Sequence, residues 1–301
     1  MKVLITGATG LVGKKLVKKL LQEKIEVNYL STSKLKLKNK LFYSGFYWNP
    51  REGQIADKAF DGVDAIIHLA GANIASRWTT AYKKEILESR VLSSNLLFET
   101  LKRMPNQVKQ VISASGTAIY PDSFDKLYSE SETNIAPGFL SDVVVQWEQS
   151  ISQIETLNIK VCKVRTGIVY AKKGGALPEI VKPIRFGFGA SFGSGKQIQS
   201  WIHIQDLVAI YQFLLINNKE GIYNAIAPET VSDEKLTKTI ATILKKPLIL
   251  PNIPRFIMKL ILGEMHELLF TNKNISSQKI QNDGFKFNFP TIKEALSAIL
   301  K

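Results

Sequence analysis

Three glycines near the start of the chain have the spacing of a phosphate-binding turn. The sequence MKVLITGATGLVG places Gly7, Gly10 and Gly13 between a short apolar run and a segment with apolar residues at helical spacing. A bare backbone in such a turn can approach a pyrophosphate closely, and the first N–H groups of the following helix attract its negative charge. The turn residues that we expect to hold a dinucleotide are Gly7, Thr9, Gly10, Leu11, Val12 and Gly13. The alternative is a degenerate turn that no longer binds nucleotide.

The residues after the second predicted strand choose between NADP and NAD. Enzymes that use NAD place an Asp or Glu there against the ribose 2′-hydroxyl, but this chain reads YLSTSK. The hydroxyls of Ser31, Thr32 and Ser33 and the ammonium of Lys34 would attract a 2′-phosphate, whereas a carboxylate would repel it. We therefore expect NADP as the cofactor, with NAD as the alternative. In the simpler interpretation of Lys34, it is a loop residue that faces solvent.

Alternating strand and helix patterns must position these groups. Helical periodicity is strongest at residues 80–103, where Pro105 follows the expected end, and continues at 141–157. The short apolar runs that we expect to form strands are residues 3–7, 25–30, 65–69, 108–113 and 159–164. The alternation indicates an α/β fold of the Rossmann-like, doubly wound type, with a parallel sheet covered by helices on both faces.

The character of the chain changes after residue 170, where glycines crowd positions 174–195 and predict loops. We expect residues 1–170 to form a dinucleotide-binding Rossmann domain, completed by strands from about 195–230. Residues 171–301 should form a smaller, mainly helical, substrate-binding C-terminal part. Its helical patterns lie at residues 233–244, 254–269 and 291–300.

Composition excludes several classes of protein. The chain has 301 residues, of which 45% are hydrophobic, and this is enough for a substantial core without disulfides. The single cysteine, Cys162, excludes an internal disulfide and a site built from cysteines, and its neighbours in KVCKV place it inside a strand. We expect no metal site. No apolar run reaches the roughly 18 residues that span a bilayer, and no signal-type stretch opens the chain, so we expect a cytoplasmic protein without a membrane partner.

The strong positive charge does not by itself indicate nucleic-acid binding. The chain has 40 Lys and Arg against 26 Asp and Glu, a formal net charge of +14. These bases are spread along the sequence, and the densest run, KLKLKNK at 34–40, contains no interleaved aromatic residue. We interpret that run as a solvated loop that shares in phosphate binding. The expected partner is a small-molecule substrate, and no nucleic acid.

The sequence resembles the extended short-chain dehydrogenase/reductases and, within them, the YfcH/SDR39U1-like NAD-dependent epimerase family. TGATGLVG at 6–13 resembles the glycine turn of the family, and GSGKQIQSWIHIQDLV at 193–208 resembles the signature of that group. The stretch from PRFIMKLILGEMHELLF to FPTIKEAL resembles its C-terminal module of the DUF1731 type, which we expect at about 248–297. The resemblance covers essentially the whole chain.

The resemblance and the strand ends together suggest further binding residues. HLAGANI resembles the segment over the adenosine side of the cofactor, and it includes His68, Leu69, Ala70 and Gly71. RTGIVY resembles the strand end beside the nicotinamide, and there Arg165 should face the ligand crevice. Arg90, expected at the cofactor, and Arg77 and Trp78, expected at the substrate, could instead form salt bridges or pack at the rim. Gln199 and Trp201 would form a wall of the substrate pocket, unless Trp201 only fills the seam between the two parts.

The family's usual proton-transfer pair has no counterpart in this sequence. Most short-chain reductases use a Tyr, a Lys four residues later, and a Ser or Thr that polarises the substrate oxygen. In PGFLSDVVVQWE, Phe139 or Leu140 stands at the Tyr position, and Val143 or Val144 stands at the Lys position.

Four other polar residues remain candidates for catalysis. Ser115 lies close to the usual Ser or Thr position, although the spacing to Tyr120 aligns Gly116 with it. Tyr120 and His203 could move a proton, but a lone histidine in an apolar strand is more often structural. Asp206 could do proton work or cap the helix that it opens.

Two functions follow from these expectations. The first is an NADP-binding epimerase-family oxidoreductase that acts on a small carbonyl or sugar-nucleotide-like substrate without the Tyr-x-x-x-Lys pair. The second is a catalytically silent, NADP-binding regulatory or scaffold protein. A homodimer fits the resemblance to extended reductases, but no sequence feature marks an interface.

Overall fold

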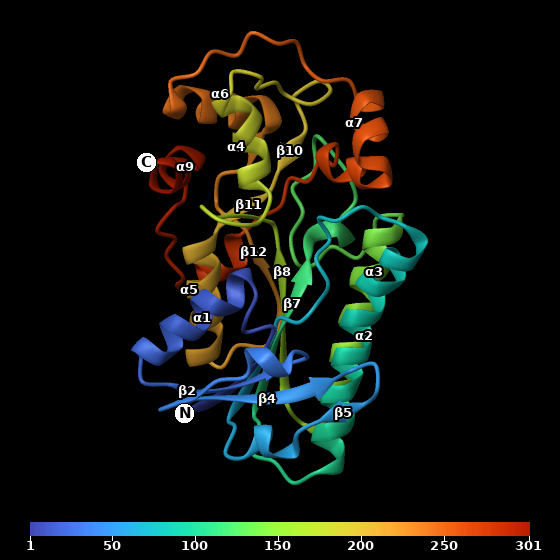
Figure 1. The fold of residues 1–301 in the computed structure, drawn as a ribbon, viewed down its shortest axis with the longest axis vertical. Coiled ribbons are helices and arrows are strands. Elements are labelled where there is room, and N and C mark those ends of the chain that lie inside the picture. The colour runs from blue at the N-terminus through green and yellow to red at the C-terminus, as the bar shows by residue number, and fades with distance from the viewer.

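A nine-stranded sheet runs through the centre of the computed structural model, which describes all residues from 1 to 301 (Figure 1). In spatial order its strands are β12 (Gly221–Ala225), β8 (Lys160–Thr166), β7 (Gln110–Gly116), β6 (Ala65–His68), β1 (Lys2–Thr6), β2 (Glu26–Ser31), β4 (Tyr43–Asn49) and β3 (Asn39–Lys40), and β5 (Gln54–Ile55) pairs with β4. All pairings are parallel except those of β4 with β3 and β5. The order of strands along the chain reverses between β1 and β6, so a ligand crevice is expected outside their carboxyl ends.

Helices cover both faces of the sheet (Figure 1). On one face lie α1 (Leu11–Gln22) and α5 (Ile204–Ile216), and on the other lie α2 (Thr80–Arg103) and α3 (Phe139–Ser152). Because side chains alternate along a strand, Val3 and Ile5 pack with α1 and α5, whereas Leu4 packs with α2 and α3. All three side chains are fully buried. The predicted Rossmann-like α/β fold is confirmed.

A smaller part stands beyond the carboxyl ends of the strands, at the top of Figure 1. Its elements are β9 (Ile168–Tyr170), α4 (Leu177–Arg185), β10 (Ile198–Gln199), β11 (Trp201–His203), β13 (Val231–Ser232), α6 (Asp233–Leu244), α7 (Arg255–Leu262) and α9 (Ile292–Leu300). The short helix α8 (Gln278–Asn282) instead packs against β12, and its Ile280 belongs to the core of the sheet. A separate apolar core joins α4, α6 and α9 around Trp201. None of the helices in the protein is both long and apolar enough to cross a bilayer.

Two of the expected helices end earlier than their apolar pattern predicted. The pattern at 141–157 becomes α3, which starts at Phe139 and gives way at Ser152 to the 3₁₀ turn Gln153–Leu157. The pattern at 254–269 becomes α7, which ends before Gly263. Gly263 has a φ of +60°, which turns the chain into the 3₁₀ segment Gly263–Leu269.

Within residues 195–230, a single strand, β12, joins the central sheet. β11 pairs with β9, and β10 pairs with β13, in two small separate sheets. The basic run at 34–40, predicted as a loop, contains the 3₁₀ turn Lys34–Lys36 and β3, and most of its residues are exposed. Cys162 lies buried inside β8, as predicted, and burial raises its pKa to about 12.

Asp206 does not cap α5, because the cap is the side chain of His203, which accepts a hydrogen bond from the N–H of Gln205. The fully buried Asp206 carboxylate accepts bonds of 2.9 Å from the N–H groups of Asn288 and Phe289 and one of 3.0 Å from the Asn288 amide. The expected capping role of Asp206 is therefore wrong. Its carboxylate ties α5 to the loop before α9.

We expect Asp206→Ala to lower the free energy of unfolding by about 3 kcal/mol, because three buried donors would lose a charged acceptor. Urea denaturation followed by circular dichroism measures the change. The matched control is Asp125→Ala, which removes an exposed carboxylate and should cost less than about 0.5 kcal/mol. Equal losses in the two variants would contradict the tether.

Candidate functional site

The glycine turn between β1 and α1 is built by close contact of three backbone segments. A Cβ on Gly13 would stand 2.2 Å from the carbonyl oxygen of Gly7, and a Cβ on Gly7 would stand 2.7 Å from that of Leu69. Gly7 also has a φ of +69°, which disfavours any side chain. The packing of β1, α1 and the end of β6 therefore requires glycine at both positions.

Gly10 differs from its two neighbours. It is exposed, its φ of −78° suits any residue, and the nearest atom to an added Cβ would be the Gly7 oxygen at 3.2 Å. Gly10 is also the N-cap of α1 and offers no side-chain acceptor, so the first N–H groups of the helix stay available. The open space beside Gly10 and the free helix N-terminus have the chemistry of a phosphate cradle.

The end of β6 is locked to β1 by one hydroxyl group. Thr6 Oγ1 accepts hydrogen bonds of 3.0 Å from the N–H groups of Leu69 and Ala70, and it lies 2.8 Å from His68 Nδ1. The imidazole Nε2 faces the hydroxyls of Ser93 and Ser94 on α2. Burial, and secondarily the charge of Arg90, lower the pKa of His68 to about 3, so this histidine is neutral. Its side chain holds the strand end in place.

Arg90 supports the turn that follows β6. Its guanidinium donates to the carbonyl oxygens of Ala72 at 3.1 Å and Ile86 at 2.8 Å, and a Cβ on Gly71 would meet it at 3.1 Å. The guanidinium also lies 5.0 Å from the centre of the Trp147 ring. Burial lowers the pKa of Arg90 to about 10. Arg90 thus contacts the segment predicted to bind the cofactor, but through its backbone carbonyls.

The end of β2 presents hydroxyls and a cation without any carboxylate. Ser31 Oγ accepts a hydrogen bond from the N–H of Ser33 at 3.1 Å, and this bond shapes the turn. Thr32 and Lys34 are exposed, and the Lys34 ammonium lies 5.0 Å above the centre of the Tyr47 ring on β4. This arrangement leaves Lys34 in a defined place while keeping its charge in solvent.

A loop that sequence analysis did not single out also reaches the glycine turn. Residues 171–175 connect β9 to α4, and a Cβ on Gly174 or Gly175 would lie 3.4 or 3.5 Å from the side chain of Leu11. Lys172 and Lys173 in this loop are exposed. The sequence signal was the pair of glycines after two lysines, which could have been interpreted as a second phosphate-facing loop.

Ser115, Tyr120 and Arg165 meet in a buried hydrogen-bonded network. Arg165 forms two bonds of 2.9 Å to the carboxylate of Glu148 on α3, and Ser115 donates to the same carboxylate at 2.6 Å. Arg165 also donates to the Tyr120 hydroxyl at 3.0 Å, and that hydroxyl donates to Asn224 at 2.8 Å. Each of the five residues is buried.

This network keeps the Arg165 guanidinium protonated and the Tyr120 hydroxyl neutral. Burial alone would lower the pKa of Arg165, but its hydrogen bonds and the Glu148 charge raise the pKa above its usual value. Burial also raises the pKa of Tyr120, and the nearby Arg165 charge only partly offsets this shift. The guanidinium, predicted to face the crevice, instead joins β8 to α3. The hydroxyls of Ser115 and Tyr120 and all three nitrogens of Arg165 are hydrogen-bonded within the network.

The beginning of α3 carries apolar side chains at the positions where the family's Tyr and Lys would stand. Val144 Cγ2 would lie 3.3 Å from a Cβ on Gly116, and Phe139 packs edge-on against Trp78 with ring centres 5.5 Å apart. Val143 belongs to the same apolar cluster, which Met265 and Leu268 of the C-terminal part complete. Together these side chains form an apolar wall, which is better suited to an apolar surface of a ligand than to a polar one.

The predicted substrate residues fall into two groups. Arg77 is exposed, and its Nε lies 4.0 Å from where a Cβ on Gly263 would be. By contrast, Trp201 is fully buried and stacks on Tyr170, and the Gln199 amide bonds to Asp233 at 3.2 Å. Trp201 and Gln199 therefore lie in the interior of the C-terminal part.

His203 is also enclosed. Its Nδ1 accepts the N–H of Gln205 at 3.2 Å, and its ring lies against Phe289 with centres 3.9 Å apart. Burial lowers the pKa of His203 to about 4, a shift that Asp206 opposes. The structure agrees with the alternative interpretation, in which this histidine is structural.

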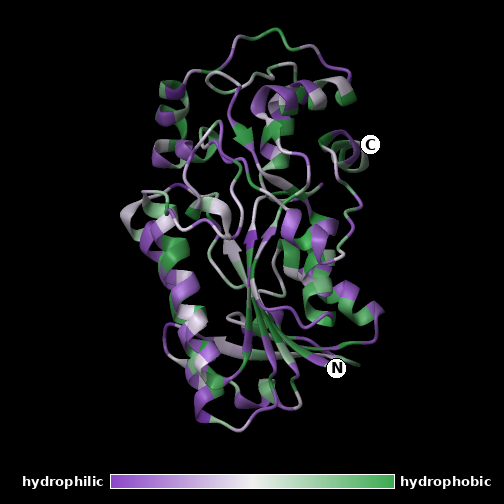
Figure 2. Cartoon of the chain, turned by 180° about the vertical axis from the view of Figure 1, so that it is seen from behind, coloured by the Kyte–Doolittle hydropathy of each residue, from purple (hydrophilic) through white to green (hydrophobic).

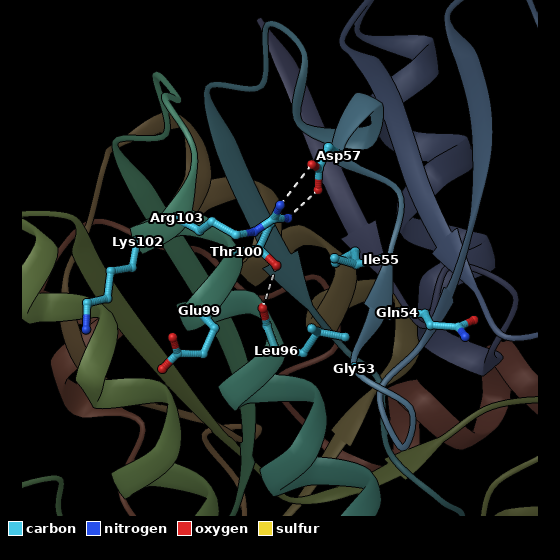
Figure 3. A pocket seen from close by; sticks show the side chains of 9 residues that line it. All are labelled: Gly53, Gln54, Ile55, Asp57, Leu96, Glu99, Thr100, Lys102 and Arg103. Atoms are coloured by element: carbon cyan, nitrogen blue, oxygen red, sulfur yellow. Dashed lines mark hydrogen bonds and ion pairs between the residues drawn. The ribbon is translucent and has the colours of Figure 1, made fainter.

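A cavity of about 760 Å³ lies elsewhere, between β5 and the last turns of α2 (Figure 3). Arg103 and Asp57 bridge it with an exposed ion pair, and Thr100 bonds to the carbonyl of Leu96. Arg103 precedes β7, so the cavity is at the amino ends of the strands, opposite the glycine turn. None of the residues that line this cavity is among those predicted from the sequence to bind or to catalyse.

Comparison with known proteins finds relatives over the full chain. Residues 3–225 match the family described as NAD dependent epimerase/dehydratase, and residues 253–299 match a domain of unknown function, DUF1731. An epimerase family protein of Staphylococcus saprophyticus is 32% identical over 99% of this chain and 98% of its own.

Two solved structures are similar in sequence and fold. The human epimerase family protein SDR39U1, crystallised with NADPH, has 27% identity and a TM-score of 0.85 over 99% of both chains. A nucleoside-diphosphate sugar epimerase from Corynebacterium glutamicum has 28% identity and a TM-score of 0.80, covering 100% of this chain and 58% of its own. The resemblance stated from the sequence, including the DUF1731-type module, is confirmed.

We expect His68 to make the fold sensitive to acid. The unfolded chain binds a proton near pH 6.5, whereas folded His68 resists protonation down to about 3. The unfolded state therefore holds more protons between these values, and stability falls as the pH decreases through this window. We compare the free energy of unfolding of the wild type with that of His68→Gln. The wild-type value minus the variant value should fall by about 2 kcal/mol from pH 7 to about pH 5. Urea titrations at several pH values measure this difference, and parallel profiles would contradict the assignment.

Proposed function

We propose, from the premise that this chain belongs to the NAD-dependent epimerase/dehydratase family, that it is an NADP(H)-dependent oxidoreductase of a small anionic substrate. The observation that supports it most is Gly10. An added Cβ at Gly10 would meet only the Gly7 carbonyl oxygen, at 3.2 Å, whereas a Cβ on Gly7 or Gly13 would collide with backbone at 2.7 or 2.2 Å. Gly10 is also exposed, so its bare backbone leaves room for a pyrophosphate on the free N-terminus of α1.

The residues around the crevice fit the parts of this cofactor. Gly7, Thr9, Gly10, Leu11, Val12 and Gly13 would hold the pyrophosphate, and the backbone of residues 68–71 would border the adenosine. The cation of Lys34, with Ser31 and Thr32, would bind a 2′-phosphate, and no carboxylate opposes it. NADPH bound in the human relative supports this choice. When bound, the cofactor supplies a hydride.

The protein's own residues would mainly bind and orient the substrate. Ser115, Tyr120 and Arg165 are committed to Glu148 and Asn224, so we assign them to positioning β7, β8 and α3 rather than to proton transfer. Phe139, Leu140 and Val143 would exclude water from the crevice. The proton of the reduced product would then come from solvent or from the substrate, without a Tyr-Lys pair.

Arg77 suggests the class of substrate. It is an exposed cation beside the apolar wall of Trp78 and Phe139, and its guanidinium forms no hydrogen bond or salt bridge within the protein. Such a cation next to an apolar surface suits a carbonyl compound with a phosphate or carboxylate group, or a sugar nucleotide. The Corynebacterium relative, a nucleoside-diphosphate sugar epimerase, is consistent with the latter.

A silent, NADP-binding regulatory protein is the second candidate. The observation that favours it is the apolar face of α3 at Leu140 and Val144, where no side chain can carry a proton. Both candidates share the cofactor site and differ only in turnover.

Cofactor binding is tested with Lys34→Glu. We expect NADPH affinity to fall by about 30-fold, since an attraction to the 2′-phosphate becomes a repulsion, while NADH affinity changes less than about threefold. Calorimetric titration measures both. Lys40→Glu, in the same exposed run, is the matched control and should change neither affinity much. Equal losses for the two cofactors in Lys34→Glu would refute the discriminating role.

A companion variant separates binding from folding. Gly10→Ala should weaken both cofactors by more than about tenfold, because its methyl group occupies the space of the pyrophosphate, with little change in thermal stability. If purified wild type bound neither cofactor, the proposal would be wrong.

The enzyme and the regulatory protein are distinguished by turnover. We expect NADPH oxidation with at least one member of a panel of anionic carbonyl compounds and sugar nucleotides, and Arg77→Ala should raise KM about tenfold or more with little change in kcat. Arg51→Ala, which removes an exposed arginine that pairs with Glu85 on α2 and does not belong to the apolar wall, is the control. NADPH binding without turnover on the whole panel would favour the regulatory protein.

A further inference from the structure

Exposed apolar side chains gather at the end of the C-terminal part that lies farthest from the sheet. They belong to two segments, residues 182–188 and residues 245–262, which we call the apical surface. Phe256 and Leu260 on α7 are 71% and 84% exposed. The other large exposed apolar residues of the apical surface are Phe186, Phe188, Ile249, Leu250, Ile257 and Ile261.

The two segments are joined in space through residues 189–193, which directly follow the first segment, and a Cβ on Gly189 would meet Ile184 of the first segment at 2.7 Å. Ile253 donates its N–H to Ser191 at 2.8 Å and accepts the N–H of Gly193 at 2.9 Å. Leu248 would lie 2.8 Å from a Cβ on Gly189. The chain after α6 arches over the top of the molecule to reach α7 (Figure 1), and much of this arch is hydrophobic (Figure 2).

Helix α7 has an apolar face without a partner. None of its eight residues is buried, and Phe256, Ile257, Leu260 and Ile261 have the spacing that places them on one face. A helix this short is marginal in water unless an apolar face is covered. An exposed face of this kind marks a site of interaction with another molecule or surface.

The charges within the two segments are all positive, and the nearest carboxylates, Glu264 and Glu267, lie on the 3₁₀ segment after α7, where Glu264 pairs with Lys83. The charged residues of the apical surface are Lys182, Arg185, Lys245, Lys246, Arg255 and Lys259, and neither segment contains an Asp or Glu. A second copy of the chain would bring like charges together, and the protein as a whole has a formal charge of +14. A partner with dense negative charge beside an apolar layer matches both features.

We propose that the apical surface binds peripherally to anionic phospholipid bilayers. The apolar face of α7 would lie among the headgroups, and the surrounding lysines and arginines would face the lipid phosphates. The absence of a spanning helix does not oppose this contact, because an interfacial helix does not cross the bilayer. This proposal departs from the expectation, drawn from the sequence, that the protein has no membrane partner. It does not rest on the proposed enzyme activity.

Vesicle flotation tests the proposal with the full-length protein. The wild type should float with vesicles of equal parts phosphatidylcholine and phosphatidylglycerol, and about tenfold less should float with phosphatidylcholine alone. The double variant Phe256→Ser with Leu260→Ser should lose at least about tenfold of the binding to the anionic vesicles. Binding of the wild type should also weaken as salt is raised.

The matched control is Leu35→Ser with Leu41→Ser. These two leucines are 96% and 83% exposed and lie among the lysines of the 34–40 run, on a different part of the surface. The control should keep wild-type flotation, and both double variants should keep the wild-type melting temperature because all four side chains are exposed.

Three outcomes would overturn the proposal. Equal flotation with neutral and anionic vesicles would remove the role of the basic residues. Loss of binding in the leucine control, with retention in the α7 variant, would place the contact at the 34–40 run. A wild-type dimer that the α7 variant converts to a monomer, without flotation, would show that a second copy covers this surface.

Discussion

The contact between Gly13 and the carbonyl of Gly7 is the constraint on which the crevice depends. Because α1 approaches the end of β1 so closely that a Cβ would stand 2.2 Å from that oxygen, the helix N-terminus points to one fixed place above the sheet. Gly7 touches Leu69 in the same way, and the Thr6 hydroxyl binds the N–H groups of Leu69 and Ala70. The first turn and the end of β6 are thus a single rigid unit, and Gly10 alone is left facing open space.

A second unit, the Glu148 and Arg165 network, decides what the rest of the crevice can do. Two charges buried between β8 and α3 are tolerated because they form a two-bond ion pair, to which Ser115 and Tyr120 add further hydrogen bonds. The network draws in Ser115 and Tyr120, which removes both from the crevice. The side chains of α3 that remain near the crevice are apolar. Any reaction there must depend on what the cofactor and the substrate bring, with the protein supplying position and exclusion of water.

The sequence was sufficient for features determined by local pattern. The strands next to the glycine turn, the full length of α2 and α6, and the cofactor turn follow from apolar period and glycine spacing. It was insufficient where the outcome depended on partners distant in the chain. Arg165 stands at the carboxyl end of a parallel strand, which predicts a crevice residue, but Glu148 reaches it from α3. Trp201, Gln199 and Asp206 are turned inward by contacts to Tyr170, Asp233 and Asn288, which no local pattern contains.

The C-terminal module connects the crevice with the outer surface of the protein. Its 3₁₀ segment Gly263–Leu269 packs Met265 and Leu268 against the apolar wall of Trp78 and Val143, whereas the preceding helix, α7, is fully outside the core. Gly263, with a φ of +60°, is the joint between the two. Lys83 adds an ion pair to Glu264 directly after that joint. Gly263, whose Cβ position would lie 4.0 Å from Arg77 Nε, thus stands where the exposed helix, the apolar wall and the exposed arginine meet.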